Sequence, residues 1–302
     1  MVSKAMSPFN VFLMLCLILF WGSSFVVVKN AFREDLTPIA IATFRFLVAG
    51  GLFLATLLVS KARRRDYALL VKRADVPTLL LLAVSGVTFF FTIQYTGIKM
   101  AGASIAAILV CFLSPILISV LSSRIFKEKL ARRQYAGIGV AAAGTLAVIG
   151  GGTMDVRGGS DFFVGSLILL LTPLLWTAYT LTGQKIIEKY SPFLVVAYVN
   201  MLGGLFLVPF SFAENSFHEI LTMDIAGWSA ILFLAFTCSL VGYFIWFYVV
   251  KHAGAAIASS FLFGEPLVTV LFATIFVGEK ITPFVVVGGL LTFAGVYLVT
   301  KK

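Results

Sequence analysis

Long apolar runs, separated by short polar connections, dominate the hydrophobic pattern of the chain. Each run covers about twenty residues, which at 1.5 Å per residue of α-helix matches a bilayer core of roughly 30 Å. The pattern predicts ten membrane-spanning helices, at residues 9–28, 37–59, 77–97, 102–123, 132–150, 163–184, 192–212, 227–249, 254–276 and 283–300. No connection is long enough to form a separate soluble domain, so we predict a single all-α membrane domain.

The two halves of the chain share a second level of pattern. In the ninth run Glu265 precedes Pro266, and Pro115 holds the matching place in the fourth run. Trp21 in the first run is matched in the same way by Trp176 in the sixth. Because each half holds five runs, an odd number, similar halves cross the membrane in opposite directions. We therefore predict two inverted five-helix repeats, at residues 1–150 and 163–302, with a linker at residues 151–162.

The lysines and arginines lie mainly in the connections, and their distribution predicts the orientation. If the N-terminus is cytoplasmic, seventeen of them fall on the cytoplasmic side, five fall on the other side, and Arg45 lies inside a run. Cytoplasmic connections are the ones that carry an excess of positive charge, so we expect both termini in the cytoplasm. Membrane orientation thereby explains the net charge of +10, and we expect no nucleic-acid binding.

Composition excludes other classes of protein. A hydrophobic content of 60%, a charged content of 12% and a mean hydropathy of +1.05 exclude an ordinary soluble domain, in which about 25% of residues are charged. The chain has no Gly-rich phosphate loop, no His-Glu-x-x-His and no Cys-x-x-Cys motif. Its three cysteines lack metal-ligand spacing, so we interpret them as small buried hydrophobes. We predict no enzyme activity, no catalytic residue, no cofactor and no metal site.

The motifs that indicate a family are Trp21-Gly-Ser-Ser-Phe with Lys29, Phe44-Arg45-Phe46, Glu265-Pro266 and Gly278-Glu279-Lys280. With these motifs the chain resembles the drug/metabolite transporter superfamily, in particular its EamA-type ten-helix branch, which carries two EamA repeats. The resemblance covers essentially the whole chain and implies a multi-pass protein of a prokaryotic plasma (inner) membrane. The first repeat departs from the pattern because Ser114 precedes Pro115, so only the second repeat supplies a midplane acid.

Members of this branch export amino acids, other metabolites or toxic compounds, so the resemblance implies a secondary transporter. We expect an exporter of amino acids or similar small polar or aromatic metabolites that works by alternating access. A nucleotide-sugar or organophosphate exchanger of the same superfamily is the alternative, but it needs several midplane cations and the chain offers only Arg45. A membrane-embedded enzyme or a passive channel is the alternative from another class. The expected partners are a small-molecule substrate, the lipid bilayer and protons as a candidate coupling ion, in a monomer or homodimer.

Glu265 is the main candidate for a functional side chain. A carboxylate at the bilayer centre costs about 2.5–3.5 kcal/mol to insert, so such a group normally faces a cavity inside the protein. It could carry a coupling proton, neutralise a cationic group of the substrate, or hydrogen-bond the backbone groups that Pro266 frees. Arg45 lies roughly 10 Å below the outer surface. We favour a structural brace for Arg45, with an ion pair to Glu265, a substrate anion or snorkelling to the surface as alternatives.

Aromatic and hydroxyl residues at helical spacing complete the predicted site. Positions i, i+3, i+4 and i+7 share one helix face. The deepest aromatic residues lie well inside their runs, away from the interface belts where Trp and Tyr are common. The predicted substrate-binding residues are Trp176, Tyr179, Tyr243, Glu265, Tyr95 and Ser24. The predicted structural or coupling residues are Arg45, Pro115 and Pro266.

Overall fold

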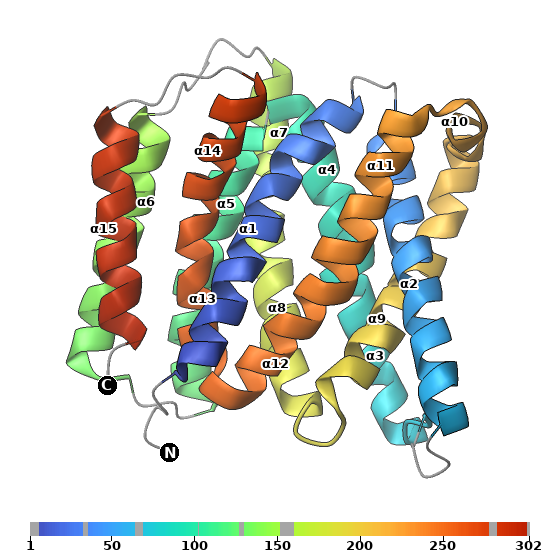
Figure 1. Ribbon diagram of the computed structural model, residues 1–302, viewed down its shortest axis with the longest axis horizontal. Coiled ribbons are helices and arrows are strands. Elements are labelled where there is room, and N and C mark those ends of the chain that lie inside the picture. Colours follow the sequence, from blue (N-terminus) through green and yellow to red (C-terminus); the bar gives the residue numbers. More distant parts are fainter. Residues whose placement is uncertain are drawn as a thin grey trace.

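A computed structural model describes residues 6–32, 36–63, 69–101, 103–126, 130–151, 160–277 and 283–300, and all regular elements in these ranges are helical. In these ranges the elements group into ten rods. The rods lie side by side (Figure 1). The first repeat contains α1 (Pro8–Ala31), α2 (Pro38–Arg63), the rod α3–η3–α4 (Val76–Ala83, Val84–Thr88 and Phe89–Ala101), α5 (Ala103–Ile125) and α6 (Arg132–Gly151). The short helix η2 (Arg73–Asp75) leads into α3.

The second repeat follows the same order. It contains the rod α7–α8 (Ser160–Leu169 and Leu171–Ile186), α9 (Pro192–Ala213), the rod α11–η4–α12 (Ile225–Phe233, Leu234–Gly242 and Tyr243–Ala253), the rod α13–η5–α14 (Ala255–Ser260, Phe261–Gly264 and Glu265–Val277) and α15 (Pro283–Thr300). The short helix α10 (Phe217–Thr222) lies between α9 and α11. The ten-helix prediction is therefore confirmed. Most of the predicted linker, residues 152–159, and the motif at residues 278–280 lie outside the described residues.

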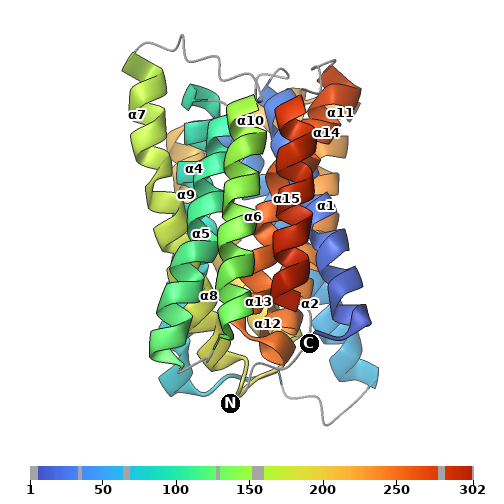
Figure 2. The ribbon, with the colours of Figure 1, turned by 90° about the vertical axis from the view of Figure 1, so that its left-hand side faces the viewer.

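Length and composition make the rods suitable for a membrane. Among the described residues, seven helical stretches are long and apolar enough to cross a bilayer, and Leu109–Ile125 and Val286–Val299 are shorter apolar helices. The helix α6 lies along α15 at one side of the bundle (Figure 2). This contact needs glycine, because a Cβ added at Gly295 would overlap the backbone of Ala141. The chain is thus a multi-pass membrane protein.

Corresponding rods of the two repeats run in opposite directions. At one end of the bundle lie the start of α1 and the ends of α8 and α15 (Figure 1). We call this end the terminal face and the opposite end the distal face. Several rods pack against their own counterparts, as α2 does against α9, α6 against α15 and α5 against α13 and α14. Such pairing is expected for inverted repeats. That the terminal face is cytoplasmic stays a prediction, and Arg33, Arg157 and Lys280, which count toward the distal side, lie outside the described residues.

Local sequence explains how the second rod of each repeat begins. The Thr37 hydroxyl accepts a hydrogen bond from the backbone N–H of Ala40 at 3.2 Å, and the next residue is proline. Ser191 caps α9 in the same way, through the N–H of Leu194 at 3.2 Å. Hydroxyl caps satisfy N–H groups that lack a partner inside the helix, and proline has no N–H to leave unpaired.

The two matching prolines differ in their effect on the helix. The helix α5 continues through Pro115, whereas a short 3₁₀ helix, η5, comes before Glu265 and Pro266. A local departure from α-helical geometry therefore precedes the proline in the second repeat only. The third rod of each repeat contains a π-helical segment, η3 in one and η4 in the other. Such segments shift the register of the side chains and are frequent at functional sites.

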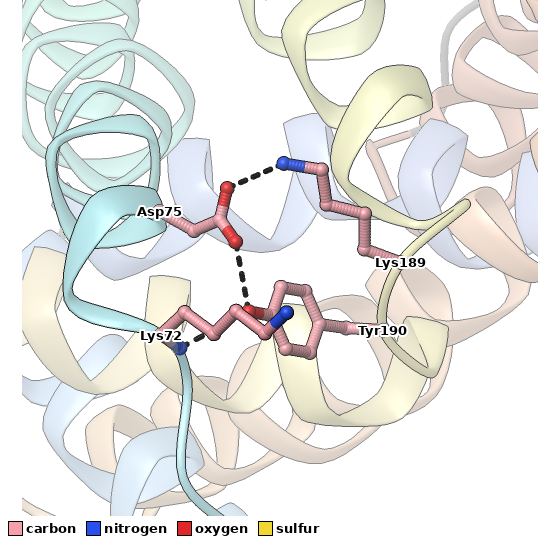
Figure 3. Close-up of polar contacts among 4 residues, drawn as sticks. All are labelled: Lys72, Asp75, Lys189 and Tyr190. Atoms are coloured by element: carbon pink, nitrogen blue, oxygen red, sulfur yellow. Dashed lines mark hydrogen bonds and ion pairs between the residues drawn. The ribbon is translucent and has the colours of Figure 1, made fainter.

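Polar contacts join the repeats at both faces. At the terminal face Asp75 forms an ion pair with Lys189 at 2.6 Å and accepts a hydrogen bond from the Tyr190 hydroxyl at 2.8 Å, while the backbone N–H of Lys72 donates to that hydroxyl at 3.0 Å (Figure 3). The bond to Asp75 raises the pKa of Lys189 above its ordinary value.

At the distal face the corresponding connections also meet through a carboxylate. The backbone N–H of Thr37 donates to Glu219 at 2.8 Å, and the Thr37 and Ser216 hydroxyls lie 3.2 Å apart. In both places the first connection of one repeat contacts the second connection of the other. The polar contacts thus follow the inverted symmetry of the rods.

Candidate functional site

A cavity lies among the inner turns of the rods, and both repeats contribute to its walls. Its lining residues are Trp21, Ser24, Phe25, Arg45, Phe90, Phe91, Gln94, Val110, Cys111, Trp176, Tyr243, Leu262 and Glu265. Measured as the space open to the centre of a water-sized sphere, its volume is about 50 Å³. One water needs about 10–15 Å³ by that measure, so the cavity has room for a few waters.

Glu265 forms the acidic part of the cavity. Its side chain is 4% exposed, and the Cys111 thiol on α5 donates to its Oε2 at 3.2 Å. The helix around it is held by Thr269, whose hydroxyl shares its one proton between the Glu265 carbonyl at 3.0 Å and the Gly22 carbonyl at 2.9 Å. The 3₁₀ helix η5 therefore ends where α14 is fixed against α1.

Arg45 forms the basic part of the cavity. Its Nε donates to the Ser239 hydroxyl at 2.7 Å and its Nη1 donates to the Tyr95 hydroxyl at 2.6 Å. The guanidinium also lies 4.5 Å from the centroid of the Phe91 ring and 5.0 Å from that of Phe46. Bonds to neutral hydroxyls and aromatic faces orient the cation without neutralising its charge.

Arg45 and Glu265 do not form an ion pair with each other. Each lines the same cavity with a neutral partner, a thiol in one case and hydroxyls in the other. Buried charges are usually paired, because removal from water is costly. The cavity therefore presents an acid and a cation that are both available to a bound molecule.

Aromatic rings form the remaining wall. Trp21 and Trp176, the matching tryptophans of the two repeats, meet edge to face with ring centroids 5.3 Å apart. Tyr243 lies 5.9 Å from Trp21 and 6.0 Å from Trp176, and Phe90 lies 5.3 Å from Trp176. A wall of this kind suits the apolar part of a ligand.

The structure brings four of the predicted binding residues to one cavity: Ser24, Trp176, Tyr243 and Glu265. Tyr95 lies behind Arg45, and Tyr179 lies behind Trp176 and Tyr243, with ring centroids 5.0 Å and 5.8 Å away. Neither of these two tyrosines lines the cavity.

The remaining predicted residues support the walls. Pro266 follows the cavity residue Glu265 at the start of α14, and Pro115 lies inside α5. Arg45 has brace-like contacts from α2 to both α4 and η4, and it also lines the cavity.

Sequence reasoning missed several cavity residues, of which Cys111 is the most informative. We interpreted it only as a small buried hydrophobe; it is buried, but its thiol also contacts the candidate acid. The available signal was the position of Cys111 in the first repeat. Cys111 lies three residues before Ser114, so these two residues share one helix face, and Ser114 is the residue that matches Glu265. The other missed lining residues are Phe90, Gln94, Val110 and Leu262.

Comparison with known proteins gives the chain a family context. Residues 8–150 and 163–301 match the EamA-like transporter family. An uncharacterized transporter of Archaeoglobus fulgidus is 30% identical over 284 residues, which cover 94% of each chain. A probable amino-acid metabolite efflux pump of Salmonella typhimurium is 26% identical, covering 97% of this chain and 95% of its own. A probable terminal-alkyne amino-acid exporter of Streptantibioticus cattleyicolor is 22% identical, covering 93% and 90%.

A solved crystal structure has a similar fold. Its TM-score is 0.73 at 17% sequence identity, and the match covers 96% of each chain. At that identity the likeness concerns the arrangement of the helices and carries no information on the ligand.

Proposed function

The chain belongs to the EamA-like transporter family, and from that premise we propose that it is a secondary transporter that exports amino acids or similar small metabolites by alternating access. The observation that carries the proposal is one cavity between the repeats, in which Glu265 and Arg45 are not paired with each other. An amino acid offers an ammonium group to the acid, a carboxylate to the cation and a side chain to the aromatic wall. The names of the Salmonella and Streptantibioticus relatives support this class of substrate.

The chemistry of the cavity favours a zwitterion over a phosphorylated compound. Among the described residues that line the cavity, Arg45 is the one with a cationic side chain. A nucleotide sugar or organophosphate carries more negative charge than one guanidinium can balance in a desolvated site. The family consists of transporters, so a membrane enzyme is excluded. Bacterial and archaeal relatives support a prokaryotic plasma membrane as the location.

Counterflow in proteoliposomes tests the proposed function. Vesicles loaded with unlabelled L-phenylalanine should transiently accumulate labelled L-phenylalanine from outside above its equilibrium level. The amine 2-phenylethylamine and the acid 3-phenylpropionate should compete more weakly, because each lacks one of the two charged groups. Equilibration without an overshoot would indicate a channel. Counterflow of an organophosphate but of no amino acid would favour the exchanger.

Glu265 has two possible functional roles in this proposal, and Glu265→Gln separates them. Glutamine keeps the shape and most hydrogen bonding but cannot titrate. If Glu265 carries the coupling proton, a pH gradient no longer drives accumulation while exchange persists. If it neutralises the substrate ammonium, affinity for L-phenylalanine itself falls. Unchanged concentrative transport in the variant would exclude both roles and leave the carboxyl group a structural one.

A further inference from the structure

On the terminal-face side of the cavity, α8 and α12 pack against each other through large side chains. On α8 the residues Trp176, Tyr179, Thr180 and Gly183 follow helical spacing and so share one face. Trp176 and Tyr179 contact Trp246 and Phe247 of α12, with ring centroids 5.5 Å and 5.0 Å apart. A Cβ added at Gly183 would overlap the Phe247 ring, so the helices are close here. We call this contact the α8–α12 seam.

The seam contains buried polar atoms that have no hydrogen-bond partner among the residues that the structure describes. They are Trp176 Nε1, Tyr179 Oη, Thr180 Oγ1 and Trp246 Nε1. Their residues are at most 4% exposed. An indole N–H can only donate and a phenol donates readily, so a ligand that satisfies these atoms has to supply hydrogen-bond acceptors.

Neighbouring rings of the same type do have partners. The Trp21 Nε1 donates to the Cys238 carbonyl at 3.1 Å, and the Tyr243 hydroxyl donates to the Gly86 carbonyl at 2.8 Å. Carbonyls of this kind are available where the π-helical segments η3 and η4 disturb the regular pattern. The unpartnered donors are therefore confined, among these rings, to the seam. A buried donor without an acceptor destabilises a fold, so its presence calls for an explanation.

The position of the seam supplies that explanation. Trp176 and Tyr243 line the cavity, and from there the two helices run to Ile186 and Ala253 at the terminal face. A substrate that leaves the cavity along the line of these two helices would separate α8 from α12. Separation of the two helices would expose the unpartnered N–H and O–H donors at the moment when the carboxylate of the substrate leaves the cavity.

We propose that the α8–α12 seam is a second, transient binding subsite, which takes the carboxylate of an amino acid on its way between the cavity and the terminal face. The proposal rests on the proposed function, because it needs a substrate with a carboxylate. Tyr179 and Trp246 are then specificity-determining residues, although neither lines the cavity in this conformation.

A matched pair of substitutions tests the premise. Tyr179→Phe removes a hydroxyl without a partner, whereas Tyr243→Phe removes one that is bonded, from a ring 5.8 Å away. The thermal unfolding midpoint of the substrate-free protein should stay unchanged or rise in Tyr179→Phe and fall in Tyr243→Phe. A fall in Tyr179→Phe as large as that in Tyr243→Phe would show that the hydroxyl is already satisfied, and would overturn the proposal.

Transport kinetics test the subsite itself. Tyr179→Phe and, as a second variant, Trp246→Phe should each raise the KM for L-phenylalanine several-fold in counterflow. Loss of affinity together with unchanged or greater stability distinguishes binding from packing. An unchanged KM in both variants would overturn the proposal even if stability rises. If the wild-type protein transports no amino acid, the proposed function fails, and the stability comparison alone then decides whether the seam donors lack partners.

Discussion

Tyr95→Phe is a sharp test of how the buried guanidinium is held. The substitution removes only the hydroxyl that accepts from Arg45 Nη1 at 2.6 Å. The ring can keep its contact with Phe91, whose centroid is 5.3 Å away, and the bond from Arg45 Nε to Ser239 remains. A hydrogen bond to a charged group contributes about 1.5–3 kcal/mol, so the free energy of unfolding should fall by about that amount.

The assay is thermal unfolding of detergent-solubilised protein, followed by intrinsic tryptophan fluorescence. With an unfolding entropy of about 2.1 cal/mol/K per residue, 1 kcal/mol shifts the midpoint of a 302-residue chain by about 1.6 °C, so the midpoint should fall by about 2–5 °C. Tyr135→Phe is the control, because Tyr135 lies on α6 and is 52% exposed, so the same chemical change should have little effect there. Counterflow of L-phenylalanine should also weaken, since the cation loses part of its orientation.

A clear outcome would refute this reasoning. If Tyr95→Phe shifts the midpoint no more than Tyr135→Phe does, the hydroxyl does not hold Arg45. Loss of stability with normal transport would mean that the Arg45 contact is a brace only.

Two further predictions concern packing and topology. Gly86→Ala should destabilise the protein by about 1–3 kcal/mol in thermal unfolding, because the new Cβ would overlap the Tyr179 ring. Gly51→Ala, where the Cβ meets no atom within 4 Å, should be neutral or slightly stabilising. In a cysteine-free background, Ala62→Cys and Glu214→Cys should react with an impermeant maleimide from opposite sides of the membrane, Ala62→Cys from the cytoplasm. Labelling of both from one side would contradict the inverted-repeat topology.

The fold was largely predictable because its signals are local. An apolar run of membrane length forms a helix in a bilayer, where backbone groups have no other partners. Pro38 and Pro192 mark helix starts, and both helices begin at these residues. The π-helical segments η3 and η4 were not predictable, since no local signal in the sequence indicates them.

The candidate site was predictable only in part. Depth in a run indicated Glu265 and Trp176, and both line the cavity. Helical spacing also indicated Tyr179. Periodicity shows which face of a helix a residue occupies but not which neighbour covers that face, and Tyr179 lies behind Trp176 and does not line the cavity. The hydrogen-bond partners of Arg45 are Tyr95 and Ser239, which lie 50 and 194 positions away from it in the sequence. No local sequence pattern connects residues at such separations.

The central claim is that the cavity beside Glu265 binds the substrate, and protection of Cys111 tests it most directly. In a variant that retains Cys111 but lacks Cys16 and Cys238, methyl methanethiosulfonate should modify a thiol that lines the cavity. L-Phenylalanine at a concentration that saturates counterflow should slow this modification several-fold. The same amino acid should not slow modification of a variant that retains only Cys16, which is not among the cavity residues. An unchanged rate at Cys111 under saturating L-phenylalanine would contradict the claim.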